Sequence, residues 1–299
     1  MIAALKIGTE PVPKDTKEAD KPEKLPLEIV SSLLLPFRNL KEVVTTEFAA
    51  AFTDQIKGLI INRFMNLTDK ELKEVDKDKL SKVLIDLKQF MSLGMDDSET
   101  AQIVEQTQLY IALRFLKSNN LEKRLKGLND IRYMVERVLQ AYKVAKRARN
   151  GASTNWQPNF EDKVKPSEHM TTQSMKEWLV ENKVLEIILG GDAHLEIVKR
   201  CAPILKFMSK YGEGKFDEDT VALVWKCQLG KHEEMVRTVY ALIQEILPAL
   251  ALKNIDAFYA KIQELPAQSY DEMFINFLKE FTREALTKKI NHDMNEYNR

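Results

Sequence analysis

Two apolar stripes that meet at a polar corner constrain the fold of this chain more than any other feature. The first stripe runs from Leu109 to Leu116, and the corner that follows is the Ser118-Asn119-Asn120 segment. After the corner, apolar residues recur three or four positions apart from Leu121 to Leu139. Because an α-helix turns once in about 3.6 residues, each series falls on one helix face. Two helices joined by so short a corner bury these stripes well only against further helices.

The rest of the chain supplies such helices. Apolar stripes with helical spacing recur from about residue 26 to residue 290, and helix pairs follow one another at intervals of roughly 40 residues without a repeated sequence motif. Glycine is scarce, at 10 of 299 residues, which disfavours a turn-rich β fold. The pattern predicts an all-α protein with an irregular HEAT- or armadillo-like helical-repeat solenoid. A compact multi-helix bundle is the alternative architecture.

Composition along the chain predicts its division into segments. Residues 1–25 hold prolines and many charges but no aromatic residue, so they cannot bury enough apolar surface to order themselves, and a disordered tail is expected. Residues 26–149 form a predicted N-terminal helical sub-domain. Residues 150–170 lose the helical period and contain two prolines, which indicates a linker or long loop. A C-terminal helical sub-domain is expected over residues 171–299.

Individual residues predict where helices begin and bend. Thr68 and Glu71 have the spacing of a capping box, which marks a helix start. Thr172 and Ser174 are cap candidates for the helix that follows the linker. Residues 194–211 read as one helix, in which Pro203 is expected to introduce a kink.

The charge balance limits the classes of partner. Lys plus Arg number 45 and Asp plus Glu number 45, so the formal net charge is zero, which argues against a dedicated nucleic-acid binder. No stretch approaches the ~18 apolar residues of a membrane span, and the apolar N-terminal run is too short for a secretion signal. A cytoplasmic, alternatively nuclear, protein is expected. The basic end of the helix near Lys143–Arg149 suits the helix dipole, and a patch for an acidic partner is the alternative interpretation.

The residues offer little basis for catalysis. Cys201 and Cys227 form no CxxC pair and lie in apolar helical stretches, which predicts buried, reduced thiols. The Gly212–Lys215 segment lacks the length and the following Ser or Thr of a phosphate-binding loop. Metal-ligand spacings are missing, so no metal and no cofactor is predicted. An α-helical hydrolase with a hidden Cys–His site stays open as a minor alternative, for which the candidate partners are His169, His194, His232 and His292.

Several segments resemble one family in the same order. Residues 113–131, LRFLKSNNLEKRLKGLNDI, resemble a stretch of the very large ubiquitin-specific proteases typified by the X-linked fat-facets deubiquitinase. The most specific likeness is VALVWKCQLGKHEEMVRTVYALI, residues 221–243. A Trp-Leu pair and the HLEIVKRCAPILKFM segment, residues 194–208, lie between the two. The family-matching positions are Leu121, Arg124, Leu125, Gly127, Leu128, Trp178, Leu179, Trp225, Gly230, Lys231, His232 and Glu233.

The resemblance, which covers roughly residues 100–290, carries an expectation about function. In those proteases this region is a non-catalytic helical scaffold upstream of the peptidase domain. The peptidase domain's Gly-Asn-Thr-Cys-Tyr and Gly-His-Tyr boxes have no counterpart here. The resemblance therefore implies a scaffold segment that is not itself an enzyme and that binds proteins, such as ubiquitin-pathway substrates or the remainder of a deubiquitinase. The polar ending NHDMNEYNR favours a fragment of a longer protease, and a free-standing helical-repeat adaptor is the alternative.

The corner within residues 221–243 also has an explanation from its residues alone. Gly230 is expected to close one helix in a left-handed turn, which glycine adopts without strain. Lys231, His232 and Glu233 would begin the next helix, which is predicted to pack back on the first. A recognition role for Lys231 and His232 is the alternative interpretation.

Overall fold

Every regular element in the described part of the chain is a helix. The computed structural model describes residues 27–36, 46–74, 76–150, 164–211, 216–266, 268 and 270–297, and these ranges contain no β-strand. The all-α prediction is therefore confirmed. The tail predicted for residues 1–25, the Gly212–Lys215 turn and most of the 150–170 loop lie outside the described residues.

The chain divides into two compact units. Unit 1 comprises the described residues of Met1–Lys123 together with Glu168–Met170, and unit 2 comprises those of Arg124–Ser167 and Thr171–Arg299. The division falls in the first turn of the helix that begins at Leu121. The domain boundary over residues 150–170 stays a prediction, because compactness alone does not establish which part folds independently.

Unit 1 packs long helices around one apolar core. Its helices are α2 (Leu27–Leu34), α3 (Thr46–Met65), α4 (Asp69–Glu74), α5 (Lys77–Met91) and α6 (Asp97–Leu116). Helix α2 packs on α5, and both α3 and α5 pack on α6. The largest side chains of this core have essentially no solvent exposure; they are Leu34, Ile56, Ile60, Phe64, Leu87, Phe90 and Phe115.

The capping box that begins α4 is confirmed. The Thr68 N–H donates to Glu71 Oε2 at 2.7 Å, and the Glu71 N–H donates to Thr68 Oγ1 at 3.2 Å. The buried Arg63 guanidinium also donates to the Glu71 carboxylate. Burial by itself raises the pKa of Glu71, but the hydrogen bonds from Thr68 and Arg63 outweigh it, so that this pKa lies below its ordinary value. One carboxylate thereby joins the end of α3 to the start of α4.

Unit 2 begins on the longest helix, α7 (Leu121–Arg149). Its inward stripe is buried as the apolar spacing predicts, with Leu128, Ile131 and Val135 without solvent exposure. From Tyr142 onward every residue of α7 is exposed, including the basic residues near its end. The apolar spacing therefore predicted the buried stripe of this helix.

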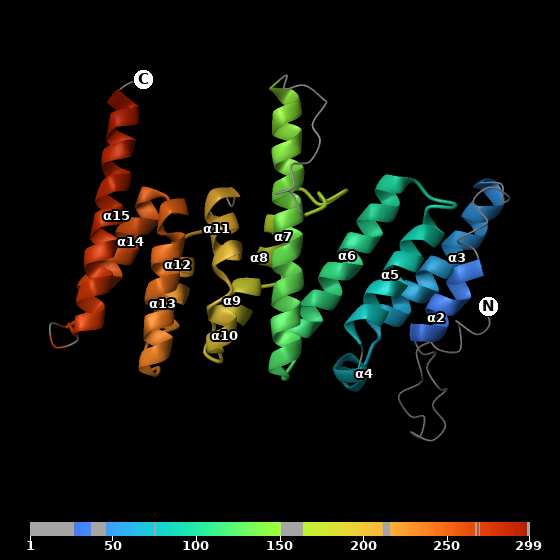
Figure 1. The fold of residues 1–299 in the computed structure, drawn as a ribbon, viewed down its shortest axis with the longest axis horizontal. Coiled ribbons are helices and arrows are strands. Elements are labelled where there is room, and N and C mark those ends of the chain that lie inside the picture. Colours follow the sequence, from blue (N-terminus) through green and yellow to red (C-terminus); the bar gives the residue numbers. More distant parts are fainter. Residues whose placement is uncertain are drawn as a thin grey trace. The chain divides into compact units, whose positions relative to one another are not determined.

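Shorter helices follow α7 in an ordered stack, which Figure 1 shows in order of sequence from green to red. They are α8 (Thr172–Glu181), α9 (Val184–Leu189), α10 (Leu195–Val198), α11 (Ala202–Tyr211), α12 (Glu218–Lys226), α13 (Glu233–Ile246), the 3-10 turn η3 (Leu247–Ala249), α14 (Leu252–Gln263) and α15 (Glu272–Tyr297). Each of them packs on elements close to it in the chain, such as α8 on α9 and α13 on α15. Near-neighbour packing of this kind is typical of a solenoid of the armadillo class.

Two helix ends differ from the sequence prediction. The 194–211 segment is two helices, α10 and α11, separated by residues 199–201, and Pro203 lies in the first turn of α11, so the prediction of one helix kinked at Pro203 was wrong. The cap of α8 is Thr171 and not Thr172. The Thr171 side chain accepts from the Ser174 N–H at 3.1 Å, and the Thr171 N–H donates to Ser174 Oγ at 2.9 Å. Serine can close a capping box in place of the usual Glu or Gln, which the spacing rule did not anticipate.

The packing of α12 and α13 is also different from the prediction. Helix α12 packs mainly on α14 and α9, whereas α13 packs on α10, α11 and α15. Trp225 of α12 and Tyr240 of α13 are in contact, and their ring centroids lie 6.4 Å apart. Tyr240 stacks on Phe277 of α15 at 4.3 Å, and its burial raises its pKa to about 12. The contact between the two helices is therefore limited, and each of them packs mainly on other elements of the stack.

Candidate functional site

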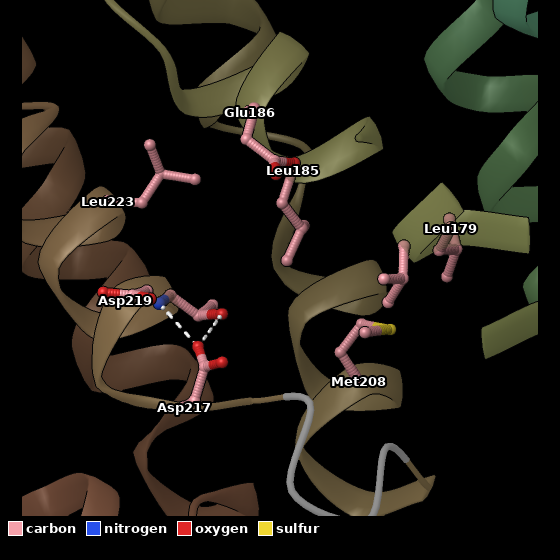
Figure 2. Close-up of a pocket in the computed structure, with 9 residues that line it drawn as sticks. Leu179, Leu185, Glu186, Met208, Asp217, Asp219 and Leu223 are labelled. Atoms are coloured by element: carbon pink, nitrogen blue, oxygen red, sulfur yellow. Dashed lines mark hydrogen bonds between the residues drawn. The ribbon is translucent and has the colours of Figure 1, made fainter. Parts of the chain in front are cut away.

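A hollow with an apolar floor and an acidic rim opens on the surface of unit 2 (Figure 2). Its volume is about 340 Å³, which is the size of one or two side chains of a partner. Helices α8, α9, α11 and α12 all contribute to it. The lining residues are Leu179, Val180, Leu185, Glu186, Met208, Asp217, Asp219, Thr220 and Leu223.

The apolar part of the hollow consists of side chains that the stack itself holds in place. Leu179 and Met208 are each 1 % exposed, so they form a fixed floor. Val180, at the end of α8, is 39 % exposed and carries apolar surface to solvent. Packing of α8 on both α9 and α11 brings these residues together although they are far apart in the sequence.

The rim carries three carboxylates from two helices. Glu186 comes from α9, Asp217 caps α12, and Asp219 lies in the first turn of α12. Asp217 Oδ1 accepts from the Thr220 N–H at 3.0 Å and from Thr220 Oγ1 at 2.9 Å, drawn as dashed lines in Figure 2. The capping role of Asp217 explains that residue, and the dipoles of α12 and α9 favour Asp219 and Glu186, each of which lies in the first turn of its helix. In the described part of the chain, Glu186 and Asp219 form no ion pair, so their charge faces solvent.

A second hollow continues the acidic surface around the start of α12. It has a volume of about 380 Å³ and is lined by Asp217, Glu218, Asp219, Lys253 and Asn254. Asp217 and Asp219 belong to both hollows. Together the two hollows have four carboxylates and one ammonium group in their lining, which gives a net charge of −3 at neutral pH.

A smaller hollow of about 230 Å³ lies at the other end of α12, lined by Ala222, Trp225, Lys226, Leu229, Lys261, Glu264 and Leu265. Lys261 of α14 pairs with Glu264, the residue after this helix, at 2.7 Å, so the two charges compensate each other. Leu229 is 53 % exposed and adds apolar surface beside this hollow. The family-matching Trp225 is thus a buried core residue that contributes only an edge to the lining of this hollow.

The family-matching residues of α7 and α8 have mostly structural positions. Gly127 and Leu128 are buried, and the side chains of Leu121, Arg124 and Leu125 are half-buried. In α8, Trp178 is half-buried and Leu179 is buried. Of these residues, Leu179 is the one that lines the acid-rimmed hollow.

The family-matching corner between α12 and α13 also has a structural explanation. Gly230 has a φ of +67°, the left-handed conformation expected for it, whereas α12 itself ends at Lys226. Lys231 Nζ donates to the Gly191 carbonyl at 2.9 Å and so connects this corner to the turn after α9. His232 is the N-cap residue of α13 without a side-chain hydrogen bond, and Glu233 pairs with Arg237 at 2.6 Å.

The turn after α9 has no room for a side chain at Gly190. A Cβ atom at Gly190 would lie 2.4 Å from the Glu186 carbonyl oxygen, to which the Gly190 N–H already donates at 2.9 Å. A side chain at position 190 would therefore disturb the end of α9. Gly190 thus closes the end of α9, the helix that carries Glu186.

Neither cysteine has the environment of a nucleophile. Both thiols are free and buried, and Cys201 Sγ donates to the Val198 carbonyl at 3.2 Å. Burial raises the pKa of both thiols, and the neighbouring Cys227 raises that of Cys201 further. A thiol must lose its proton to act as a nucleophile, so this environment opposes reactivity. Among the described residues, no hydrogen bond joins either thiol to a histidine, and no group of three potential ligands could hold a metal ion.

The acid-rimmed hollow is thus one feature of the described surface that brings together side chains from several helices. The resemblance singled out Leu179 as a family match, but no sequence signal pointed to Glu186 or Asp219. These residues lie on separate helices, and no local spacing connects them. Of the helices that the structure describes, none is long and apolar enough to cross a membrane.

The fold and the surface together define a helical-repeat protein of the armadillo class. The family model described as "UBP24/USP9X/USP9Y ARM repeat" matches residues 102–293, most of the chain. The chain belongs to this family.

Similar proteins are large ubiquitin carboxyl-terminal hydrolases. Ubiquitin carboxyl-terminal hydrolase 9X of Mus musculus is 27% identical over 79% of this chain and 9% of the relative. Ubiquitin carboxyl-terminal hydrolase 34 of Homo sapiens is 24% identical over 81% of this chain and 6% of the relative. The probable ubiquitin carboxyl-terminal hydrolase FAF of Drosophila melanogaster is 24% identical over 80% and 8%, respectively. The chain thus spans less than a tenth of the length of these relatives, and no solved structure matches it.

Proposed function

We propose that this chain is a non-catalytic scaffold segment of a large ubiquitin-specific protease, which binds proteins or positions a catalytic domain that lies outside it. The observation that carries the proposal is the family match over residues 102–293. The matched relatives are named as ubiquitin hydrolases, yet the match covers a helical-repeat region of them. Extended surfaces of helical repeats commonly serve as protein-binding faces, which agrees with the acid-rimmed hollow.

The chemistry of the thiols supports the non-catalytic assignment. A cysteine protease needs a thiolate with a nearby base, and such thiols have lowered pKa values. Here burial raises the pKa of both thiols. The proposed partners are proteins of the ubiquitin pathway or the rest of a deubiquitinase, and the proposed location is the cytoplasm or the nucleus.

A reporter protein fused to the C-terminus of ubiquitin tests the proposal. The purified chain is expected to leave the fusion intact, because it offers no thiolate to attack the junction. The matched control is the C201S/C227S double variant, which should behave identically. Cleavage by the native chain that disappears in the double variant would establish a catalytic cysteine and refute the proposal.

The free-standing adaptor is the second candidate, since the helical-repeat fold alone would support either role. The coding sequence after Arg299 discriminates between them. A reading frame that continues into a peptidase cysteine box supports the scaffold segment, whereas a stop codon directly after Arg299 supports the adaptor.

A further inference from the structure

We infer that the exposed end of α7, together with the end of α11, binds an acidic segment of a partner protein that carries an aromatic side chain. The inference rests on the proposed function, because it names the chemistry of one partner that the scaffold would bind. This basic face consists of Tyr142, Lys146 and Arg149 of α7 and Lys210 and Tyr211 of α11.

The basic face continues the stripe by which α7 packs on its own unit. The buried members of that stripe are Leu128, Ile131, Val135 and Val138. The same spacing of three or four positions leads on to Tyr142, Lys146 and Arg149, so helical periodicity places these three residues on the same side of α7. Where α7 leaves the core, its packing side is therefore exposed and basic.

Ring contacts bring the end of α11 to this stripe. Tyr142 lies edge-on to Tyr211, with ring centroids 5.3 Å apart, and Lys210 Nζ lies 5.6 Å from the centre of the Tyr211 ring. The end of α7 continues past α11 (Figure 1), and every residue of α7 from Tyr142 onward is exposed. Tyr142 is 40 % exposed although its ring contacts Tyr211, so it presents apolar surface beside the cations.

The described part of the structure gives these cations no partner of opposite charge. Lys143, Lys146 and Arg149 form no ion pair with any described residue. The same holds for Lys210, whose ammonium group lies over a tyrosine ring. The sequence has no Asp or Glu between Glu136 and the end of α7. Uncompensated charges of one sign attract a partner of the opposite charge and repel others.

The helix dipole alone does not explain this end of α7. Cations near a helix C-terminus favour the dipole, but the effect is confined to the last turn, and Lys143 lies before that turn. Helices in proteins gain most of their stability from packing, yet about two turns of α7 extend beyond its buried residues. Aromatic residues and Arg are enriched in protein–protein interfaces, so an exposed ring among cations is suited to a protein partner.

An acidic protein segment fits this face better than a nucleic acid does. Proteins that bind nucleic acids gain affinity from many phosphate contacts along an extended basic surface. Here the basic face spans two helix ends, and the chain as a whole has 45 basic and 45 acidic residues. A few carboxylates match these cations in number, and an aromatic side chain among them can contact the exposed ring of Tyr142.

Fluorescence anisotropy with synthetic peptides tests the inference on the full chain. The probe is a rhodamine-labelled peptide with a Glu-Glu-Phe-Glu-Glu core in a Gly-Ser host. Peptides in which Gln replaces every Glu, or Ser replaces Phe, separate the contributions of charge and ring contact. Both replacements should weaken binding, and added salt should weaken binding of the Glu peptide, because salt screens exposed charges.

Charge reversal on the protein locates the binding. The K146E/R149E variant should weaken binding of the Glu peptide by about fivefold or more, since two attractive contacts become repulsive. The matched control is K279E/K289E, which makes the same change of net charge at exposed positions on α15. It should bind almost as the native chain does. Thermal unfolding of each variant confirms that it is folded.

A fluorine spectrum gives a readout that does not depend on the net charge. The eight tyrosines are replaced by 3-fluorotyrosine, and the Tyr142→Phe and Tyr270→Phe variants identify two of the signals. Tyr270 is 41 % exposed, so it is a control of matched exposure outside the basic face. The Tyr142 signal is expected to shift when the Glu peptide is added, and the Tyr270 signal is expected to stay in place.

Several results would overturn the inference. They are equal binding of the Glu peptide and either of its altered forms, equal losses in the two double variants, and a Tyr142 signal that the peptide does not shift. Tighter binding of a labelled single-stranded oligo-uridine with the same charge would assign the face to nucleic acid and would overturn it as well. Each leaves the scaffold assignment standing if the same preparation does not cleave the ubiquitin fusion. Cleavage of the fusion would instead refute the scaffold assignment, whatever the peptides do.

Discussion

Replacing Glu105 by alanine is expected to lower the free energy of unfolding of unit 1 by about 3 kcal/mol. Glu105 lies in α6 with 2 % of its side chain exposed. Its carboxylate accepts three backbone N–H groups, from Glu168 at 3.0 Å, His169 at 3.2 Å and Met170 at 2.8 Å. Without the carboxylate these donors lose their partner, and an unsatisfied buried N–H costs about 1–3 kcal/mol.

Urea denaturation and amide hydrogen exchange measure this effect. Exchange at residues 168–170 should quicken by more than the global loss of stability explains, because Glu105 is the partner of all three amides. Glu105→Gln should fall between the native chain and Glu105→Ala, since an amide keeps one acceptor and loses the charge. Gln106→Ala, at the exposed neighbouring position, is the control and should change little. Unchanged protection of residues 168–170 in Glu105→Ala would show that this contact does not hold the segment.

Replacing Phe281 by alanine is expected to cost unit 2 about 3–5 kcal/mol of stability. Phe281 is 1 % exposed, and its ring lies 5.7 Å from that of Phe277, which in turn stacks on Tyr240 of α13. The aromatic row of α15 therefore holds this helix on its neighbours α13 and α14. Truncation removes buried apolar surface and leaves a cavity that the surrounding rings fill only in part.

The same helix supplies the control. Leu286 of α15 is 55 % exposed, so Leu286→Ala should change stability by about 0.5 kcal/mol or less. Urea denaturation gives the free energies, and hydrogen exchange in α13 shows whether the loss spreads beyond α15. Equal effects of Phe281→Ala and Leu286→Ala would contradict the assignment of the buried face of α15.

Local sequence signals predicted most of the helices because the required information lies within a few residues. The stripe that contains Leu128 and Val135 is buried, Thr68 and Glu71 cap α4, and Gly230 adopts the left-handed turn. Each of these follows from helical periodicity, side-chain capping or the freedom of glycine. The misplaced cap of α8 shows the limit of such rules, since a serine took the usual place of an acidic residue.

Contacts between distant segments were not predictable in this way. Glu105 looks like an ordinary polar residue of a helix, and its three partners lie more than 60 positions further along the chain. Glu186 and Asp219 meet only because α9 and α12 pack on one another. The resemblance to the protease family identified the region but not this hollow, since Leu179 is the one family-matching residue in its lining.

The alkylation rate of the two native thiols is the sharpest test of the proposed scaffold role, in which this chain binds proteins and has no reactive thiol. The folded chain is treated with iodoacetamide across a range of pH and examined by intact mass. A raised pKa means that the thiolate fraction at neutral pH is below that of an exposed cysteine, and burial blocks access as well. No label is expected on the folded chain at neutral pH, and two labels are expected after unfolding in urea. Rapid labelling of Cys201 or Cys227 in the folded chain, persisting below the ordinary cysteine pKa, would contradict it.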